Sequence, residues 1–130
     1  GLGQNKFSGH IPPGIGALTN LELLWLHNNR FSGSLPDSMR KLTNLGYILL
    51  SRNKFTGTVP DIFGNMAHLW GLFLDANRFT GRIPSSLSNL AFYGQFSAAN
   101  TSLTGDLGFL CKSLDPLHGL AIADCLGNNA

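Results

Sequence analysis

Four copies of one eight-residue phrase recur in this chain, and successive copies start 24 residues apart. The copies are NKFSGHIP at 5–12, NRFSGSLP at 29–36, NKFTGTVP at 53–60 and NRFTGRIP at 77–84. A constant period of this length predicts stacked coils in which each coil packs on its neighbours. Because such solenoids expose long regular surfaces, the repeat also favours a protein that works by binding.

The second half of each period carries apolar residues at spacings of three, three and two positions. Leu18, Leu21, Leu24 and Leu26 show this pattern in the first coil. The two-residue step from Leu24 to Leu26 is typical of a strand, with both side chains on one face and Trp25 on the other. One short strand per coil, stacked in register, predicts a parallel sheet.

Four columns of residues follow each predicted strand, and each column has an expected role. The asparagines are expected to form a structural ladder, because a buried amide can satisfy backbone groups of neighbouring coils. The phenylalanines are expected to stack as a spine, the glycines to allow a tight or left-handed bend, and the prolines to fix an extended step. The columns are Asn5, Asn29, Asn53 and Asn77; Phe7, Phe31, Phe55 and Phe79; Gly9, Gly33, Gly57, Gly81 and Gly105; and Pro12, Pro36, Pro60 and Pro84.

Together these columns resemble the plant-type leucine-rich repeat, LxxLxxLxLxxNxLxGxIPxxLxxLxx, over essentially the whole chain. The resemblance implies an α/β solenoid with a parallel sheet on the concave face and short irregular or 3-10 helical turns on the convex face. We expect about five 24-residue repeats: residues 1–106 form the repeats, the first incomplete because the chain starts inside a repeat, and residues 107–130 form a C-terminal capping repeat. Similar proteins include receptor-kinase ectodomains and polygalacturonase-inhibiting proteins, and this family binds far more often than it catalyses.

Both cysteines lie in the expected capping repeat. We interpret Cys111 and Cys125 as a disulfide, which indicates an oxidising compartment; the alternative is two separate buried thiols in a cytosolic domain. The closing stretch ADCLGNNA is similar to the cysteine-bearing ends of secreted algal leucine-rich-repeat proteins. Asn100 begins the only N-x-S/T sequon and is a candidate glycosylation site. These features favour a secreted or extracellular protein, or one in another oxidising lumen.

Composition and motifs argue against several other classes of protein. The net charge of +2 is too mild for a nucleic-acid binder, and no apolar run approaches the roughly 18 residues that a membrane helix requires. Histidine and cysteine share no metal-ligand spacing, and the chain has no nucleophile elbow, phosphate loop or paired acids. We therefore expect no enzyme activity, no catalytic residue, no cofactor and no metal.

Strand alternation predicts which side chains point away from the core. Trp25, Leu49 and Phe73 fall in one outward row, and Trp70 also points outward. Exposed apolar residues flanked by polar ones usually mark an interaction site, and large aromatics dominate binding hot spots. The predicted partner-binding residues are Trp25, His27, Tyr47, Leu49, Arg52, Trp70, Phe73 and Asp75. The alternative is that a missing N-terminal cap or a neighbouring segment covers Trp25.

A second column is wholly basic and consists of Lys6, Arg30, Lys54 and Arg78. It indicates either an acidic partner, such as a polyuronate or an anionic protein face, or an ordinary solvated edge.

Two functions remain open from the sequence. The first is a non-catalytic binding module that recognises a protein, peptide or glycan through the aromatic concave face. The second is a structural subunit or scaffold held within a larger assembly in an oxidising lumen or cell wall.

Overall fold

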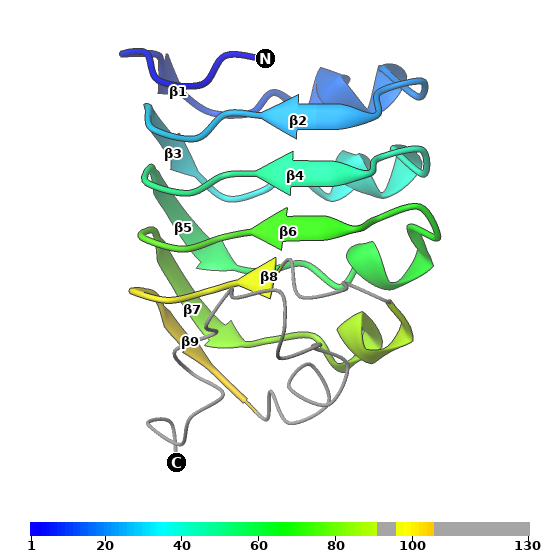
Figure 1. Cartoon of the computed structure of the whole chain (residues 1–130). Coiled ribbons are helices and arrows are strands. Elements are labelled where there is room, and N and C mark those ends of the chain that lie inside the picture. Colours follow the sequence, from blue (N-terminus) through cyan, green and yellow to red (C-terminus); the bar gives the residue numbers. More distant parts are fainter. Residues whose placement is uncertain (91–95, 106–130) are drawn as a thin grey trace, which may run out of the picture.

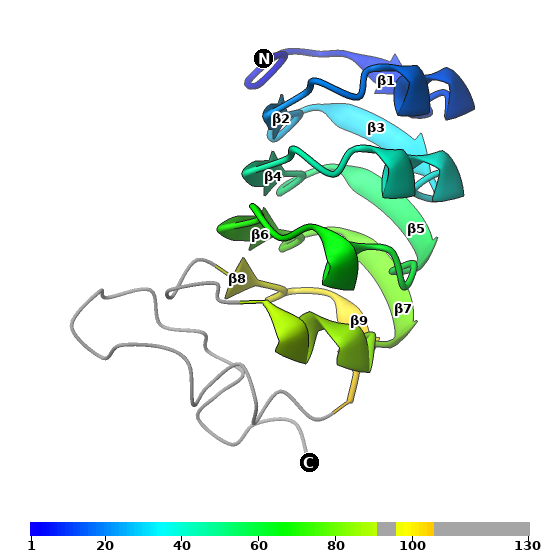
Figure 2. The same ribbon diagram turned by 90° about the vertical axis from the view of Figure 1, so that its right-hand side faces the viewer.

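The computed structural model describes residues 1–90 and 96–105, and these residues form a stack of similar coils (Figure 1). A complete coil runs through one strand, a second strand and a short 3-10 helix before the next coil begins. Figure 2 shows these elements on different sides of the stack. The predicted capping repeat at 107–130, with Cys111 and Cys125, lies outside the described residues.

The first sheet consists of the strands that the leucine pattern predicts. Its order is β2 (Leu23–Trp25), β4 (Tyr47–Leu49), β6 (Gly71–Phe73) and β8 (Phe96–Ser97), and all pairs are parallel. The central residues Leu24, Ile48 and Leu72 are buried in the core. The register places each residue beside its counterpart 24 positions later, such as Leu24 beside Ile48. The predicted parallel sheet and the direction of its side chains are therefore confirmed.

A second parallel sheet runs along another side of the stack, and the sequence patterns do not predict it. Its strands, in order, are β1 (Ser8–Gly9), β3 (Arg30–Gly33), β5 (Lys54–Thr58), β7 (Arg78–Arg82) and β9 (Ser102–Thr104). Its register differs from that of the first sheet, because Thr56 pairs with Arg78, which lies 22 positions later in the chain. Each strand is therefore displaced by two residues relative to its repeat counterpart in the preceding coil.

Short 3-10 helices form the remaining side of the coils, as the sequence predicts. They are η1 (Pro13–Ala17), η2 (Asp37–Lys41), η3 (Phe63–Asn65) and η4 (Ser85–Asn89). Three of them follow a proline in an extended conformation; at Pro12, for example, φ is −70° and ψ is 146°. Among residues 1–90 and 96–105, no helix is long and apolar enough to cross a membrane.

The asparagine column forms the predicted ladder inside the stack. Asn53 Nδ2 donates to the carbonyl oxygens of Leu26 at 2.8 Å and Leu50 at 3.1 Å. Its Oδ1 accepts a hydrogen bond from the Phe31 amide at 3.0 Å. The same contacts recur at two further positions, Asn29 and Asn77. Each amide therefore satisfies backbone groups of its own coil and of the coil before it.

The phenylalanine spine is confirmed for the inner coils. Phe31 and Phe55 stack with ring centroids 6.2 Å apart, and Phe55 and Phe79 with centroids 6.1 Å apart. The prediction is wrong for Phe7, which is 46% exposed. Asn5 is also exposed, but its Nδ2 still donates to the carbonyls of Leu2 and Gly3, which are the own-coil contacts of the ladder. Both lie in the first described coil, where a neighbouring coil packs on one side only.

The glycine column has the left-handed conformation that the sequence predicts. Gly33, Gly57 and Gly81 have φ values of 76°, 77° and 80°. A Cβ atom at Gly81 would lie 3.0 Å from Thr58 Cγ2, and one at Gly33 would lie 2.2 Å from His10 Nδ1. The backbone angle therefore favours glycine at this column, and at Gly33 and Gly81 a Cβ atom would in addition require the neighbouring side chain to move.

Candidate functional site

The outward side of the first sheet carries large apolar side chains, and we call it the aromatic face. It is defined by Leu23, Trp25, Tyr47, Leu49, Trp70 and Phe73. Leu23, Trp25 and Trp70 are 46%, 43% and 52% exposed. The strand register aligns Trp25 with Leu49 and Leu49 with Phe73, and neighbouring strands lie about 4.8 Å apart. Trp25, Leu49 and Phe73 therefore form one continuous apolar row across three coils.

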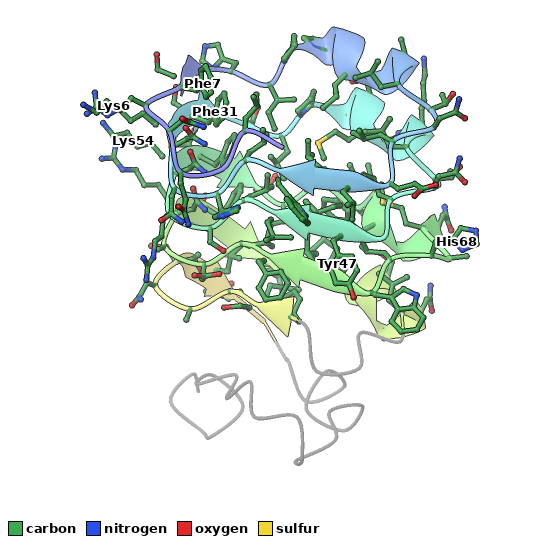
Figure 3. All side chains as sticks on the ribbon, turned by 45° about the horizontal axis from the view of Figure 1, so that its top comes forward. Lys6, Phe7, Phe31, Tyr47, Lys54 and His68 are labelled. Atoms are coloured by element: carbon green, nitrogen blue, oxygen red, sulfur yellow. The ribbon has the colours of Figure 1, made fainter. Side chains whose placement is uncertain are left out.

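An open hollow of about 410 Å³ lies on this face around Tyr47 and Trp70. Its lining consists of Glu22, Leu23, Asn44, Gly46, Tyr47, His68 and Trp70. The Tyr47 ring lies directly over Gly71, because a Cβ atom there would be only 2.6 Å from Tyr47 Cδ1. Glycine at this position thus lets the ring lie against the sheet. The hollow combines two aromatic rings with the carboxylate of Glu22 and the imidazole of His68, seen with Tyr47 in Figure 3.

The next outward row consists of His27, Ser51 and Asp75, and contacts within the protein already occupy part of it. Ser51 Oγ donates a hydrogen bond to Asp75 Oδ1 at 2.6 Å, so the Asp75 carboxylate already has a partner within the protein. His27, in the same row, has a buried Nδ1 without a hydrogen-bond partner in the described part of the chain. A Cβ atom at Gly3 would lie 2.5 Å from His27 Cε1, so the first residues of the chain cover this ring. His27 and Asp75 are therefore less available than the sequence suggests.

The N-terminal residues also run beside Trp25. The Leu2 amide donates to the Trp25 carbonyl at 2.8 Å, and the Gln4 amide donates to the His27 carbonyl at 2.9 Å. A Cβ atom at Gly1 would lie 3.2 Å from Trp25 Cε3. This segment contacts one edge of the indole, and 43% of Trp25 remains exposed.

Two further predicted site residues lie in the turns between the sheets. Arg52 and Asn100 are both exposed and have positive φ values of 57° and 54°. Arg52 lies outside the aromatic face, and it is not among the residues that line the hollow. Asn100 is accessible at the surface, and its glycosylation stays a prediction.

The hollow adds three polar residues that are not among the predicted partner-binding residues: Glu22, Asn44 and His68. Glu22 lies in the same outward column as Trp70, so strand alternation is sufficient to find it. Asn44 and His68 precede their strands, and alternation does not describe the direction of side chains in a turn. In the described coils, no group of three or more His, Cys, Asp or Glu residues could hold a metal ion.

Comparisons with known proteins agree with this geometry. A family model described as Leucine rich repeat matches residues 19–79. No curated protein matches the sequence. Many solved structures do match, and several are ectodomains of plant receptor kinases.

Three of these structures show the range of the likeness. The ectodomain of the Arabidopsis thaliana receptor kinase GASSHO1/SCHENGEN3, solved in complex with CASPARIAN STRIP INTEGRITY FACTOR 2, is 41% identical with a TM-score of 0.76 over 85% of this chain and 14% of that chain. The Arabidopsis receptor kinase HAESA, solved with the peptide hormone IDA and the co-receptor SERK1, is 35% identical with a TM-score of 0.74 over 80% of this chain and 17% of that chain. The ectodomain of the receptor kinase SOBIR1 from Arabidopsis thaliana is 30% identical with a TM-score of 0.75 over 79% of this chain and 55% of that chain.

The chain therefore spans little more than half of the SOBIR1 ectodomain and less than a fifth of the other two proteins. The coil geometry and the comparisons together identify the described residues as a leucine-rich-repeat solenoid, similar to plant receptor-kinase ectodomains.

Proposed function

We propose that this chain is a non-catalytic, extracellular binding module that recognises a peptide or a protein segment through the aromatic face. The observation that supports the proposal most is the joint exposure of Leu23, Trp25 and Trp70 on one side of one sheet. Large exposed apolar side chains grouped on a rigid surface usually mark an interaction site, because burying them against a partner is favourable.

The hollow around Tyr47 and Trp70 supports a specific binding contact rather than nonspecific hydrophobic association. Aromatic rings supply most of the contact energy in binding hot spots, whereas polar groups at the rim orient the partner. Glu22 and His68 provide one acidic and one imidazole group beside the two rings. A peptide that places an apolar side chain in the hollow could form hydrogen bonds with these rim groups.

The peptide or protein class is favoured over a glycan by the comparisons. The solved relatives include HAESA in complex with the peptide hormone IDA and GASSHO1/SCHENGEN3 in complex with CASPARIAN STRIP INTEGRITY FACTOR 2. A neutral glycan stacked on Trp25 and Trp70 is the alternative ligand for the same face.

A second candidate function, a structural subunit within a larger assembly, is favoured by a different observation. The N-terminal end of the solenoid has an apolar hollow of about 420 Å³ whose lining includes Ile15, Leu18 and Leu21. Leu18 is 56% exposed there, although its column is buried in the next coils at Leu42 and Met66. Either another coil of the same protein or a separate subunit would bury these side chains, and only a separate subunit supports this candidate. A single-size monomer in size-exclusion chromatography with light scattering would count against this candidate.

The proposal is tested by selecting ligands from a displayed random-peptide library on the native chain. A selected peptide should bind Trp25→Ala and Trp70→Ala at least about 2 kcal/mol more weakly, the loss expected for a hot-spot residue. Phe7→Ala, which removes a ring that is 46% exposed but lies outside the aromatic face, is the matched control and should bind the peptide as the native chain does. Selection of no peptide, or of peptides indifferent to both tryptophan changes, would contradict the proposal. Parallel screening of neutral glycans identifies the alternative ligand.

A further inference from the structure

The outward side of the second sheet is basic and lies on a different side of the coils from the aromatic face. Five of the nine Lys and Arg residues of the chain lie on or beside its strands, and all five are exposed: Lys6, Arg30, Lys54, Arg78 and Arg82. Figure 3 shows Lys6 and Lys54 projecting from the same side of the solenoid, away from Tyr47 and His68. We call this surface the basic face.

No acidic side chain of the described coils lies on these strands. Asp37 pairs with Arg40 at 2.6 Å on η2, and Asp61 accepts a hydrogen bond from Ser86 beside the 3-10 helices. Asp75 is bonded to Ser51, and Glu22 lines the hollow of the aromatic face. Within residues 1–90 and 96–105, the charge of the basic face is therefore not compensated by carboxylates.

The shifted register of this sheet places hydroxyl groups between the cations. Ser8 lies beside Arg30, and Thr56 lies beside Arg78, each pair on adjacent strands. The same register pairs Ser32 with Lys54. A basic residue and a hydroxyl residue are thus side by side on neighbouring strands in each of these pairs.

The same shift separates the cations from one another. A displacement of two residues along the strand, combined with the strand separation, puts successive basic residues of the column about 8 Å apart at Cα rather than about 4.8 Å. This distance is comparable to the Debye length of about 8 Å at physiological salt, so mutual repulsion between exposed charges is weak. The face can therefore present several cations at regular intervals at little cost in stability.

The chemistry of the basic face selects among anionic partners. Phe31, Phe55 and Phe79 point into the core from these strands and are at most 8% exposed, so the described part of the face offers a single ring for stacking of nucleic-acid bases, that of Phe7 beside Lys6, which is 46% exposed. Phe7 is also the only large hydrophobic side chain exposed beside the described strands of this face, whereas protein hot spots are usually clusters of such anchors. The face instead matches a polymer that carries both anionic groups and hydroxyl groups. The cationic side chains can donate hydrogen bonds to the anionic groups, and the serine and threonine hydroxyls can form hydrogen bonds with the hydroxyl groups.

We propose that the basic face binds an anionic polysaccharide, carboxylated or sulfated, that lies across successive coils. Lys54, Arg78 and Arg82 hold its anionic groups through charge-assisted hydrogen bonds. The hydroxyls of Thr56 and Thr80 hold its sugar hydroxyls. This site is independent of the partner proposed for the aromatic face, so either proposal can fail without the other.

The test measures binding of the native chain to polygalacturonate, heparin and neutral dextran at low and physiological ionic strength. Polygalacturonate carries carboxylates and heparin carries sulfates in addition, so the two polymers distinguish the anionic groups. Binding to at least one of them, with none to dextran, is expected. The double variant Lys54→Gln/Arg78→Gln should weaken that binding about ten-fold or more, because it removes two charge-assisted hydrogen-bond donors.

Two matched variants make the test specific. Arg40→Gln/Lys41→Gln removes the same number of positive charges from the exposed side of η2 and should leave affinity within about two-fold. Thr56→Val/Thr80→Val keeps the charge and the side-chain size and should still reduce affinity by several-fold, because hydroxyl contacts are lost. Circular dichroism verifies that each variant is folded.

Three results would overturn the proposal. Equal losses in the two charge variants would show that net charge alone attracts the polymer. Unchanged affinity in the threonine variant would remove the reason for choosing a polysaccharide. Single-stranded DNA that binds as tightly as the preferred polysaccharide would assign the face to polyanions in general.

Discussion

Replacing Asn53 by alanine removes the centre of the asparagine ladder. The Asn53 side-chain amide contacts four backbone groups: it donates to the carbonyls of Leu26, Leu50 and, at 3.4 Å, Ser51, and it accepts from the amide of Phe31. The three carbonyls keep other bonds, because Asn29 Nδ2 also reaches Leu26, Asn77 Nδ2 also reaches Leu50, and the Asn28 amide donates to Ser51. The buried Phe31 amide, in contrast, loses the acceptor that it uses in this structure.

The expected cost of the substitution follows from these contacts. A buried donor without a partner costs about 1–3 kcal/mol, and each lost hydrogen bond contributes about 1 kcal/mol. Asn53→Ala should therefore lower the free energy of unfolding by about 3 kcal/mol. For a domain of this size, such a loss lowers the melting temperature on the order of 10 °C.

Asn5→Ala is the matched control for this change. Asn5 belongs to the same column but is exposed, and its amide bonds only to the nearby carbonyls of Leu2 and Gly3. Asn28→Ala is a poorer control, because Asn28 has a φ of 55°, where asparagine is tolerated better than alanine. Urea unfolding followed by circular dichroism measures both variants. Equal destabilisation by Asn5→Ala and Asn53→Ala would refute the ladder argument.

Three further changes test other parts of the structure. Phe55→Ala should destabilise the chain by about 3–5 kcal/mol in urea unfolding, because a fully buried ring between two stacked rings leaves a cavity; a loss below 1 kcal/mol would show that the spine is not packed. Gly81→Ala should cost at least about 1–2 kcal/mol, because its φ is 80°, whereas Gly14→Ala, with open space around it, should cost nothing measurable; similar melting temperatures for the two would contradict this. Intact-mass analysis after alkylation in denaturant without reductant should find no modified thiol if Cys111 and Cys125 are bonded, and two alkylated thiols would disprove the disulfide.

The sequence is sufficient to predict the first sheet and its outward row. Leu24 and Leu26 bracket Trp25 in a two-residue step, and local strand geometry alone sends the tryptophan out of the core. The left-handed glycines follow similarly from a local requirement, since only glycine adopts positive φ without cost. Features determined by one coil and its period can therefore be predicted.

Features that depend on contacts between coils cannot be predicted in the same way. In the second sheet, β3 spans only Arg30–Gly33, with a single apolar residue and a glycine, so it lacks a recognisable strand pattern. Its hydrogen bonds form only when the next coil is displaced by two residues. Phe7 has the same repeat context as Phe55, yet it is exposed because a described coil packs on only one of its sides.

In the candidate site, too, features set within one coil can be predicted, whereas features set by contacts between coils cannot. Strand alternation places Tyr47 and Trp70 on the aromatic face, and the structure confirms both positions. The hollow between them also depends on Gly71, over which the Tyr47 ring lies, and on His68 in the preceding turn. The path of a turn across neighbouring coils is a tertiary property, and the repeat pattern contains no information about it.

Hydroxyl-radical footprinting of the chain with and without a selected peptide tests most directly whether the aromatic face is the binding surface. Trp25 and Trp70 are exposed enough to be oxidised in the free chain. Bound peptide should protect both tryptophans and Tyr47, and it should leave Phe7, exposed in the first coil, as reactive as before. Protection confined to Phe7 or the second sheet, with both tryptophans still oxidised at the free rate, would contradict the proposed function.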